Sequence, residues 1–464
     1  MGKMSSRRSK SGSSARLLSR DRIGRDNDRN VSALCRSLFA YLFFLSLAGG
    51  AEVNFDLRGI LLVLSSVIFI IFAAHQGAFA GWPVAPSFLK AALILLLAYA
   101  ILQVVPLPPQ IWHALPGQTL RTETLASAAL VDSWQPISLT PVFSFYSAIM
   151  IIGAVVALCA LFQLTDHEFR CSAALIALMI GLGMAIGAIQ ISTGGSFPRF
   201  YRSSDDALIG LYANKNHMGL ALASSILIAH FLLAVRDARW SSPRQLLFYA
   251  YWVLVLIALP LTNSRAGVVF GLIVSAAVVW SGTVKYDWKV RVGAGATMLI
   301  LALVLAVSPL PQLLAERFSV IADDDRWEIF ARSTTLLNPY GYFGSGLGSF
   351  RDIFFTYEKI EWVEPFYLNN AHNDYLQIII EMGLVGGSIV ATLGIAVLFA
   401  ALKTRQAESG QAKQAAWMGL VIVVLFGLHS LVDYPLRRPA AVAIFLLGLA
   451  GLMRIYRSAS PRSA

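Results

Sequence analysis

The stretch that decides the fold is residues 142–163, which read VFSFYSAIMIIGAVVALCALFQ without one charged side chain. A helix needs about 20 apolar residues to cross the hydrocarbon core of a bilayer, and this stretch supplies them alone. The rest of the chain has the same character, because 57% of its 464 residues are hydrophobic and only 14% are charged. Soluble domains are usually about 25% charged. The sequence therefore predicts an all-α integral membrane protein.

Further stretches of this kind predict a chain with about twelve transmembrane helices. Loops rich in Lys and Arg stay in the cytoplasm, so the basic residues set the orientation. With the N-terminus inside, about 24 of the 37 basic residues and roughly 8 of the 26 acidic ones fall on the inner side. Both termini are thus predicted to be cytoplasmic, and the net charge of +11 needs no nucleic-acid partner. The predicted spans are residues 34–50, 59–76, 88–105, 142–163, 171–191, 216–235, 247–262, 265–282, 292–309, 373–402, 415–432 and 439–456.

This topology divides the chain into five segments. Ser and Arg dominate the first, which has almost nothing to bury and is predicted to be disordered. The two outer loops are long, and the second is large enough to fold into a small helical subdomain. The segments are a basic cytoplasmic tail (1–33), spans one to nine with an outer loop at 106–141 (34–309), a large outer loop (310–372), spans ten to twelve (373–457) and a cytoplasmic tail (458–464).

The sequence predicts neither a bound metal nor a cofactor. The three cysteines lie in or beside apolar segments and form no C-x-x-C motif. Three aspartates at 323–325 could suggest Mg²⁺, but such a run before an amphipathic helix more often caps the helix. The glycines of Gly344-Ser-Gly-Leu-Gly348 follow no predicted strand and lack the Lys-Ser/Thr ending of a phosphate loop, so they predict a flexible turn.

Charged and polar residues at the outer ends of the spans are the candidates for function. Arg265 lies between two spans, where an arginine costs several kcal/mol unless it is paired or hydrated. Arg326 lies on a predicted helix of the large outer loop, and His372 stands where that loop enters the tenth span. The alternatives are an arginine that snorkels to the interface and a histidine that is structural. In the turn at 429–439, Asp433 could pair with either of two following arginines or with another arginine.

Several fixed cations beside one histidine match an anionic lipid-linked substrate. Arginine binds phosphate oxygens in pairs and does not deprotonate, so it suits a pyrophosphate group. A histidine near those arginines and a helix N-terminus is driven to its neutral form, which a general base requires. A sugar hydroxyl that loses its proton to His372 could then attack the anomeric carbon of the donor. A polyprenyl pyrophosphate leaving group would carry the driving force, so ATP is not needed.

The chain also resembles a known family. The pattern His372-Asn373, nine residues and then Gly383-x-x-Gly386 is similar to the H-N-x9-G-x-x-G pattern of O-antigen ligases and related bacterial O-oligosaccharyltransferases. The stretches at 262–267, 210–216 and 429–439 also resemble that superfamily, and the resemblance covers about residues 193–439. It implies a metal-independent GT-C-type glycosyltransferase of the bacterial inner membrane, whose large periplasmic loop lies over the active site.

The resemblance further implies the substrates and the residues of the site. The donor would be a polyprenyl-pyrophosphate-linked glycan, and the acceptor lipid A-core or a growing polysaccharide. Ligation is preferred slightly over polymerisation, and protein glycosylation stays open. Arg317 or Arg332 could take the place of Arg326. The implied catalytic residues are His372, Arg265 and Arg326, and the implied substrate-binding residues are Asn373, Asn216, Lys215, Asp433, Arg437 and Arg438.

A transporter or flippase of lipid-linked glycans is the alternative from another class. Transporters carry polar residues along the middles of their spans, where these residues line a path. Here the middles of the predicted spans are nearly uncharged, and the arginines gather at one rim. This distribution favours an enzyme that works at the membrane surface.

Overall fold

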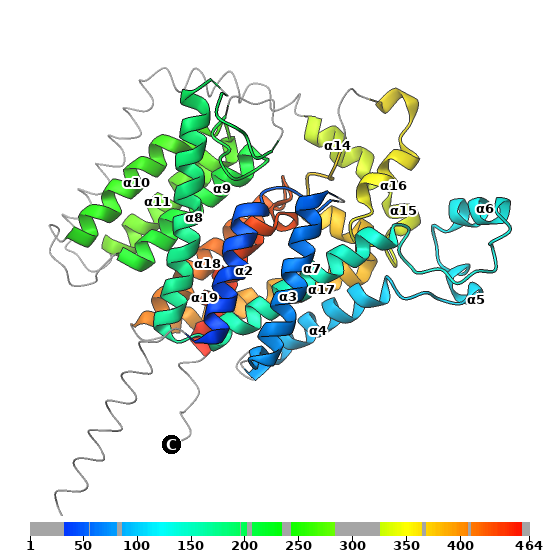
Figure 1. Ribbon diagram of the computed structural model, residues 1–464, viewed down its shortest axis with the longest axis horizontal. Helices are drawn as coiled ribbons and strands as arrows, with labels where there is room; N and C mark the ends of the chain where they lie inside the picture. Colours follow the sequence, from blue (N-terminus) through cyan, green and yellow to red (C-terminus); the bar gives the residue numbers. More distant parts are fainter. Residues whose placement is uncertain are drawn as a thin grey trace, which may run out of the picture.

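The computed structural model describes residues 32–54, 56–80, 86–194, 196–201, 207–233, 243–283, 325–363, 368–406 and 410–456. Within these ranges the regular structure is helical, and one isolated β-bridge joins Leu107 to Gln135 (Figure 1). Eight helices among the described residues are long and apolar enough to cross a membrane. The fold agrees with the predicted all-α integral membrane protein, while the count of twelve spans stays a prediction.

Each predicted span that falls within the described ranges corresponds to an apolar helix. The predicted ninth span at 292–309, nearly all of the N-terminal tail and the C-terminal tail lie outside the described residues. The apolar helices are α2 (Ala33–Ala48), α3 (Leu57–His75), α4 (Ser87–Leu102), α7 (Pro141–Gln163), α8 (Asp166–Ser192), α9 (Lys215–Leu233), α10 (Pro243–Leu261), α11 (Arg265–Thr283), α17 (Asp374–Gln406), α18 (Gln411–His429) and α19 (Pro439–Met453).

Shorter helices lie in the predicted outer loops and turns. The described part of the large loop folds as the predicted helical subdomain, because Tyr340, Phe350 and Phe354 pack with Leu376 and Ile380 near the start of α17. Figure 1 shows α14 to α16 at one end of the bundle, with α5 and α6 beyond them. The short helices are α5 (Pro109–Trp112), α6 (Thr119–Ser127), α14 (Asp325–Thr334), α15 (Leu337–Tyr340), α16 (Phe350–Tyr357), η3 (Ile360–Trp362), η4 (Pro435–Arg437) and η5 (Arg454–Tyr456).

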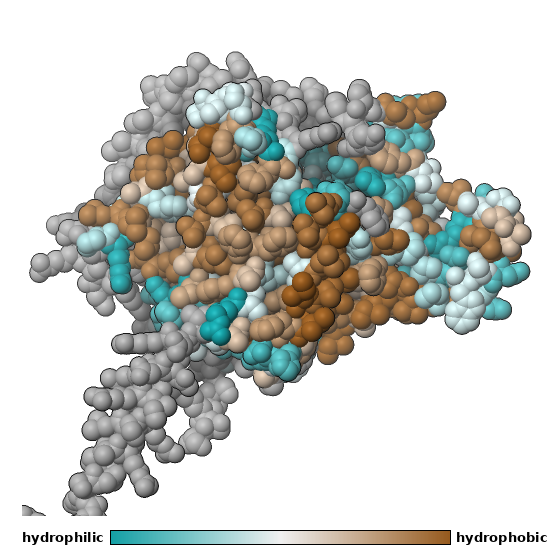
Figure 2. Space-filling model, viewed as in Figure 1, coloured by the Kyte–Doolittle hydropathy of each residue, from teal (hydrophilic) through white to brown (hydrophobic). Residues whose placement is uncertain are grey.

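The outer helices of the bundle expose apolar side chains. Along α3, Ile60, Leu64, Ile68 and Ile71 are exposed, and Figure 2 shows apolar residues spread over this face of the molecule. A soluble monomer rarely exposes such a continuous apolar surface to water, whereas the lipid of a bilayer can cover it without a free-energy penalty. By contrast, 83% of the span formed by α19 is buried among its neighbours.

The helix α8 begins at Asp166, five residues before the predicted span. The mostly polar residues at 166–170 form the start of this helix. Thr165 caps that turn, because its side chain accepts from the Glu168 amide while the Glu168 carboxylate accepts from the Thr165 amide. Glu168 also accepts from the Ser32 amide at 2.9 Å, which ties α8 to the start of α2.

The helix α17 is broken at Gly383. This residue has φ 61° and ψ −156°, a backbone conformation that is essentially restricted to glycine. Backbone amides of the predicted Gly344–Gly348 turn satisfy carbonyls at the break, since Ser345 donates to Ile380 at 2.9 Å and Gly346 donates to Glu381 at 3.0 Å. The predicted tenth span is therefore two helical pieces, and the first piece carries the residues that follow His372.

Candidate active site

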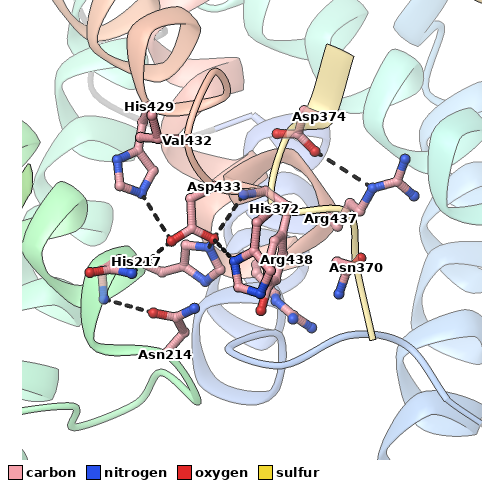
Figure 3. A network of polar contacts seen from close by, with 12 residues as sticks. Asn214, His217, Asn370, His372, Asp374, His429, Val432, Asp433, Arg437 and Arg438 are labelled. Atoms are coloured by element: carbon pink, nitrogen blue, oxygen red, sulfur yellow. Dashed lines mark hydrogen bonds and ion pairs between the residues drawn. The ribbon is translucent and has the colours of Figure 1, made fainter. Parts of the chain in front are cut away.

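The centre of the candidate site is the buried carboxylate of Asp433, in the turn between α18 and α19. Its Oδ1 lies 3.4 Å from Nε2 of His217 and 3.9 Å from Nδ1 of His372, and its Oδ2 lies 3.8 Å from Nε2 of His429. Three imidazoles from separate segments thus surround one carboxylate (Figure 3). The sequence pattern suggested an arginine partner for Asp433 and did not predict these three histidine neighbours.

Two hydrogen bonds fix the Asp433 carboxylate in place. Asn216 donates from Nδ2 to Oδ2 at 2.7 Å, and the Tyr434 amide donates to Oδ1 at 2.9 Å. Burial alone would raise the pKa of Asp433, but the three histidines outweigh it and hold that pKa well below its usual value. Asp433 is therefore an anion at the centre of the site.

The Asn216 side chain joins α9 to α11 as well. Its Oδ1 accepts from the Ser264 hydroxyl at 2.9 Å, and that hydroxyl accepts from the Gly267 amide at 3.0 Å. The two helices meet where a Cβ on Gly219 would stand only 2.9 Å from the Cα of Gly267, so only glycine fits there. Both ends of the Asn216 amide are used inside the protein, which favours a positioning role over direct contact with substrate.

His372 occupies a strained position just before α17. Its φ of 49° is in the left-handed region that non-glycine residues rarely adopt, and such strain is concentrated at functional sites. Its side chain remains 22% exposed, whereas those of His217 and His429 are at most 1% exposed. Burial lowers the pKa of His372 to about 4; Asp433 opposes this shift and Arg326 adds to it. His372 is thus a neutral imidazole that a substrate can reach.

Two of the predicted arginines flank this cluster. Arg326, on α14, donates from Nη1 to the Val432 carbonyl at 3.3 Å, one residue before Asp433. Arg438 is buried, with its guanidinium 4.7 Å from the centre of the Tyr434 ring and 3.8 Å from a Glu52 oxygen. Both arginines also lower the pKa of His372, because positive charge disfavours the imidazolium form.

Two more predicted binding residues are engaged inside the protein. Arg437 reaches Oε2 of the buried Glu381 at 2.8 Å and Oδ1 of Asp374 at 3.6 Å, so it holds the first piece of α17 to the turn (Figure 3). Asn373 accepts from the Leu376 amide at 2.9 Å and donates to the Leu431 carbonyl at 3.0 Å. These contacts favour positioning roles for both residues.

The remaining predicted residues lie around the site. Arg265 is the first residue of α11 and directly follows Ser264, and Lys215 is the first residue of α9 beside Asn216; both are half-buried. Arg332 is held within the outer subdomain by Glu328 and by the Trp362 carbonyl, and Arg317 lies outside the described residues. Among the described arginines of the large loop, Arg326 is the one seen to contact the turn at Asp433.

Sequence reasoning missed His217 and His429 as members of the cluster. His217 directly follows Asn216 where an apolar run begins, and His429 stands where another apolar run ends, at the start of the turn 429–439. With Asp433, their ligand atoms lie within 4.8 Å of one another, which is an arrangement that could hold a metal ion. The positions of these three residues along the chain did not predict this set.

Comparison with known proteins bears on the middle of the chain. Residues 250–391 match the family model described as O-antigen ligase. The matched segment includes Arg265, Arg326 and His372 and ends shortly after the break at Gly383. It lies within the 193–439 range of the resemblance drawn from the motifs. No curated protein matches the chain.

Proposed function

The chain belongs to the O-antigen ligase superfamily, and from that premise we propose that it transfers a glycan from a polyprenyl-pyrophosphate donor to an acceptor hydroxyl. The observation that carries the proposal is the convergence of Arg326, Arg438 and the reachable His372 around one buried carboxylate. The site would lie on the periplasmic face of the bacterial inner membrane, with both chain termini in the cytoplasm, as the charge distribution favours.

The proposed chemistry follows from the placement of His372. Its Nδ1 faces Asp433, which leaves Nε2 for the acceptor hydroxyl. His372 takes the hydroxyl proton, the oxygen forms a bond to the anomeric carbon, and the bond from that carbon to the pyrophosphate breaks. Polyprenyl pyrophosphate leaves as an anion.

The arginines would stabilise this leaving group. Arg265, Arg326 and Arg438 offer guanidinium groups that do not deprotonate and that bind phosphate oxygens in pairs. Negative charge builds on the pyrophosphate as the bond breaks, so these cations act most strongly in the transition state. The partners proposed for the chain are the lipid-linked donor, a lipid A-core or polysaccharide acceptor, and the bilayer.

The test is glycan transfer by the purified full-length protein, with a synthetic polyprenyl-pyrophosphate glycan as donor. A general base contributes about 10²–10⁴-fold to rate, so His372→Ala should lose at least about 100-fold. Arg265→Ala should be similarly impaired, and Arg265→Lys should recover little because lysine cannot make paired contacts. Matched controls are His113→Ala, an exposed histidine of the first outer loop, and Arg351→Ala, which pairs with the adjacent Asp352. Equal rates for all five proteins would refute the proposed site.

The products separate the remaining alternatives. A ligase, which we prefer, moves the glycan onto the separate lipid acceptor. A polymerase of the same superfamily instead lengthens a glycan that stays linked to polyprenyl pyrophosphate. A flippase would release no polyprenyl pyrophosphate at all, because it leaves the glycosidic bond intact.

A further inference from the structure

The two fully buried histidines of the site both face Asp433, at distances longer than the usual hydrogen bond. None of the four ring nitrogens of His217 and His429 makes a hydrogen bond within the described part of the chain. Buried polar groups without partners are costly and rare in native proteins. Their Nε2 atoms approach opposite oxygens of Asp433, at 3.4 Å and 3.8 Å.

These separations are longer than the usual hydrogen bond, and they suit ligands that share one cation. Hydrogen bonds from N–H to oxygen usually span about 2.7–3.2 Å. In a tetrahedral zinc site with bonds of about 2.0–2.1 Å, neighbouring ligand atoms are about 3.3–3.4 Å apart. The His217 separation falls in that range, and a shift of a few tenths of an ångström would bring His429 into it.

The surroundings of Asp433 fit the same reading. Asn216 and the Tyr434 amide each donate to a different carboxylate oxygen, and ligating carboxylates are typically held by such outer hydrogen bonds. A cation would also neutralise a carboxylate that is fully buried among helices.

We propose that His217, His429 and Asp433 bind one divalent transition-metal ion of the zinc type. A ligand set of two imidazoles and one carboxylate binds zinc in preference to magnesium or calcium. The ligands come from α9, from the end of α18 and from the α18–α19 turn. The ion would therefore fasten these three segments together and fix the carboxylate that faces His372.

This inference does not rest on the proposed function, and it leaves the transfer chemistry to His372 and the arginines. It departs from the absence of metal predicted from the sequence. A cation enclosed by residues that are at most 1% exposed exchanges slowly, so an enzyme that tolerates a chelator can still contain it.

The test measures metal rather than activity. The full-length protein is expressed in medium supplemented with Zn²⁺, purified in detergent, washed free of unbound metal, and analysed by elemental mass spectrometry. About one zinc per chain is expected, and the double variant His217→Asn/His429→Asn should retain less than about a tenth of it. The matched control is His230→Asn, a histidine of the same helix α9 that packs against the rings of Phe248 and Trp417. Wild-type protein without zinc, or a double variant that keeps it, would overturn the inference.

A second variant guards against simple misfolding. His429→Cys replaces one zinc ligand by another, so it should keep the metal that His429→Asn loses. With Co²⁺ in place of zinc, His429→Cys should show a sulfur-to-cobalt charge-transfer band that the wild-type protein lacks. Absence of this band in folded His429→Cys would equally count against the site.

Discussion

The break in α17 makes a sharp prediction for Gly383→Ala. At φ 61° and ψ −156°, a residue with a side chain costs about 1–3 kcal/mol in backbone strain. The new Cβ would also stand 2.1 Å from the Tyr342 carbonyl oxygen and 2.4 Å from its carbon. That carbonyl accepts from the Leu384 amide at 3.0 Å, and moving it away sacrifices this bond at about 1 kcal/mol.

Together these effects should destabilise the junction by about 3–5 kcal/mol if a neighbouring turn bond is lost as well. Gly387→Ala is the matched control, because its Cβ would meet only the Ile379 side chain, at an ordinary 3.7 Å. Alanine should stabilise that helical position by up to about 1 kcal/mol.

Thermal unfolding of the purified variants in detergent measures the difference. We expect Gly383→Ala to unfold at least about 5 °C below the wild-type protein and Gly387→Ala to unfold at or slightly above it. Transfer activity should follow the same order, because the piece of α17 before the break leads directly from His372. Indistinguishable unfolding temperatures for the two variants would show that the glycine is not needed for the break.

Two further predictions concern charge. Arg437→Met leaves Glu381 buried without its partner, so it should cost about 3–5 kcal/mol of stability. Adding Glu381→Met should recover much of that loss in thermal unfolding, and purely additive losses would contradict a coupled pair. Reporter fusions should place Ala238 and Gln406 in the cytoplasm and Phe355 outside, because positive charge gathers on the side of the first two. A cytoplasmic signal at Phe355 would invert the predicted topology and move the site to the other face.

The length of the apolar runs alone located the helices of the bundle. A membrane-spanning helix needs such a run whichever helices it packs against. That length could not locate the start of α8, where a capping box turns polar residues into a first helical turn. Nor could it locate the break in α17, because the carbonyls of Ile380 and Glu381 accept hydrogen bonds from a turn about 35 residues earlier in the chain.

In the candidate site, too, some residues could be predicted from the sequence and others depend on contacts that form only in the folded chain. Arg326 and His372 stood out because charge and a polar motif at a membrane rim are conspicuous, and the structure brings both toward Asp433. Arg437 looked equally available in the sequence, but only the folded chain reveals the buried Glu381 that engages it. His217 and His429 were not predicted, because the sequence does not show that they lie beside the Asp433 carboxylate in space.

The burial of α19 has a consequence for how the protein is assembled. This helix touches α2, α7, α8, α9, α17 and α18, all of which precede it in the chain. During synthesis those helices enter the membrane before α19, around which they pack. Until α19 is inserted, lipid must cover the surfaces that will later contact it. Asp433 arrives only with the turn that leads into α19, and so the charged centre is completed at the same late step. A chain stalled before residue 430 would be a set of inserted helices that lack both α19 and the Asp433 carboxylate of the candidate site.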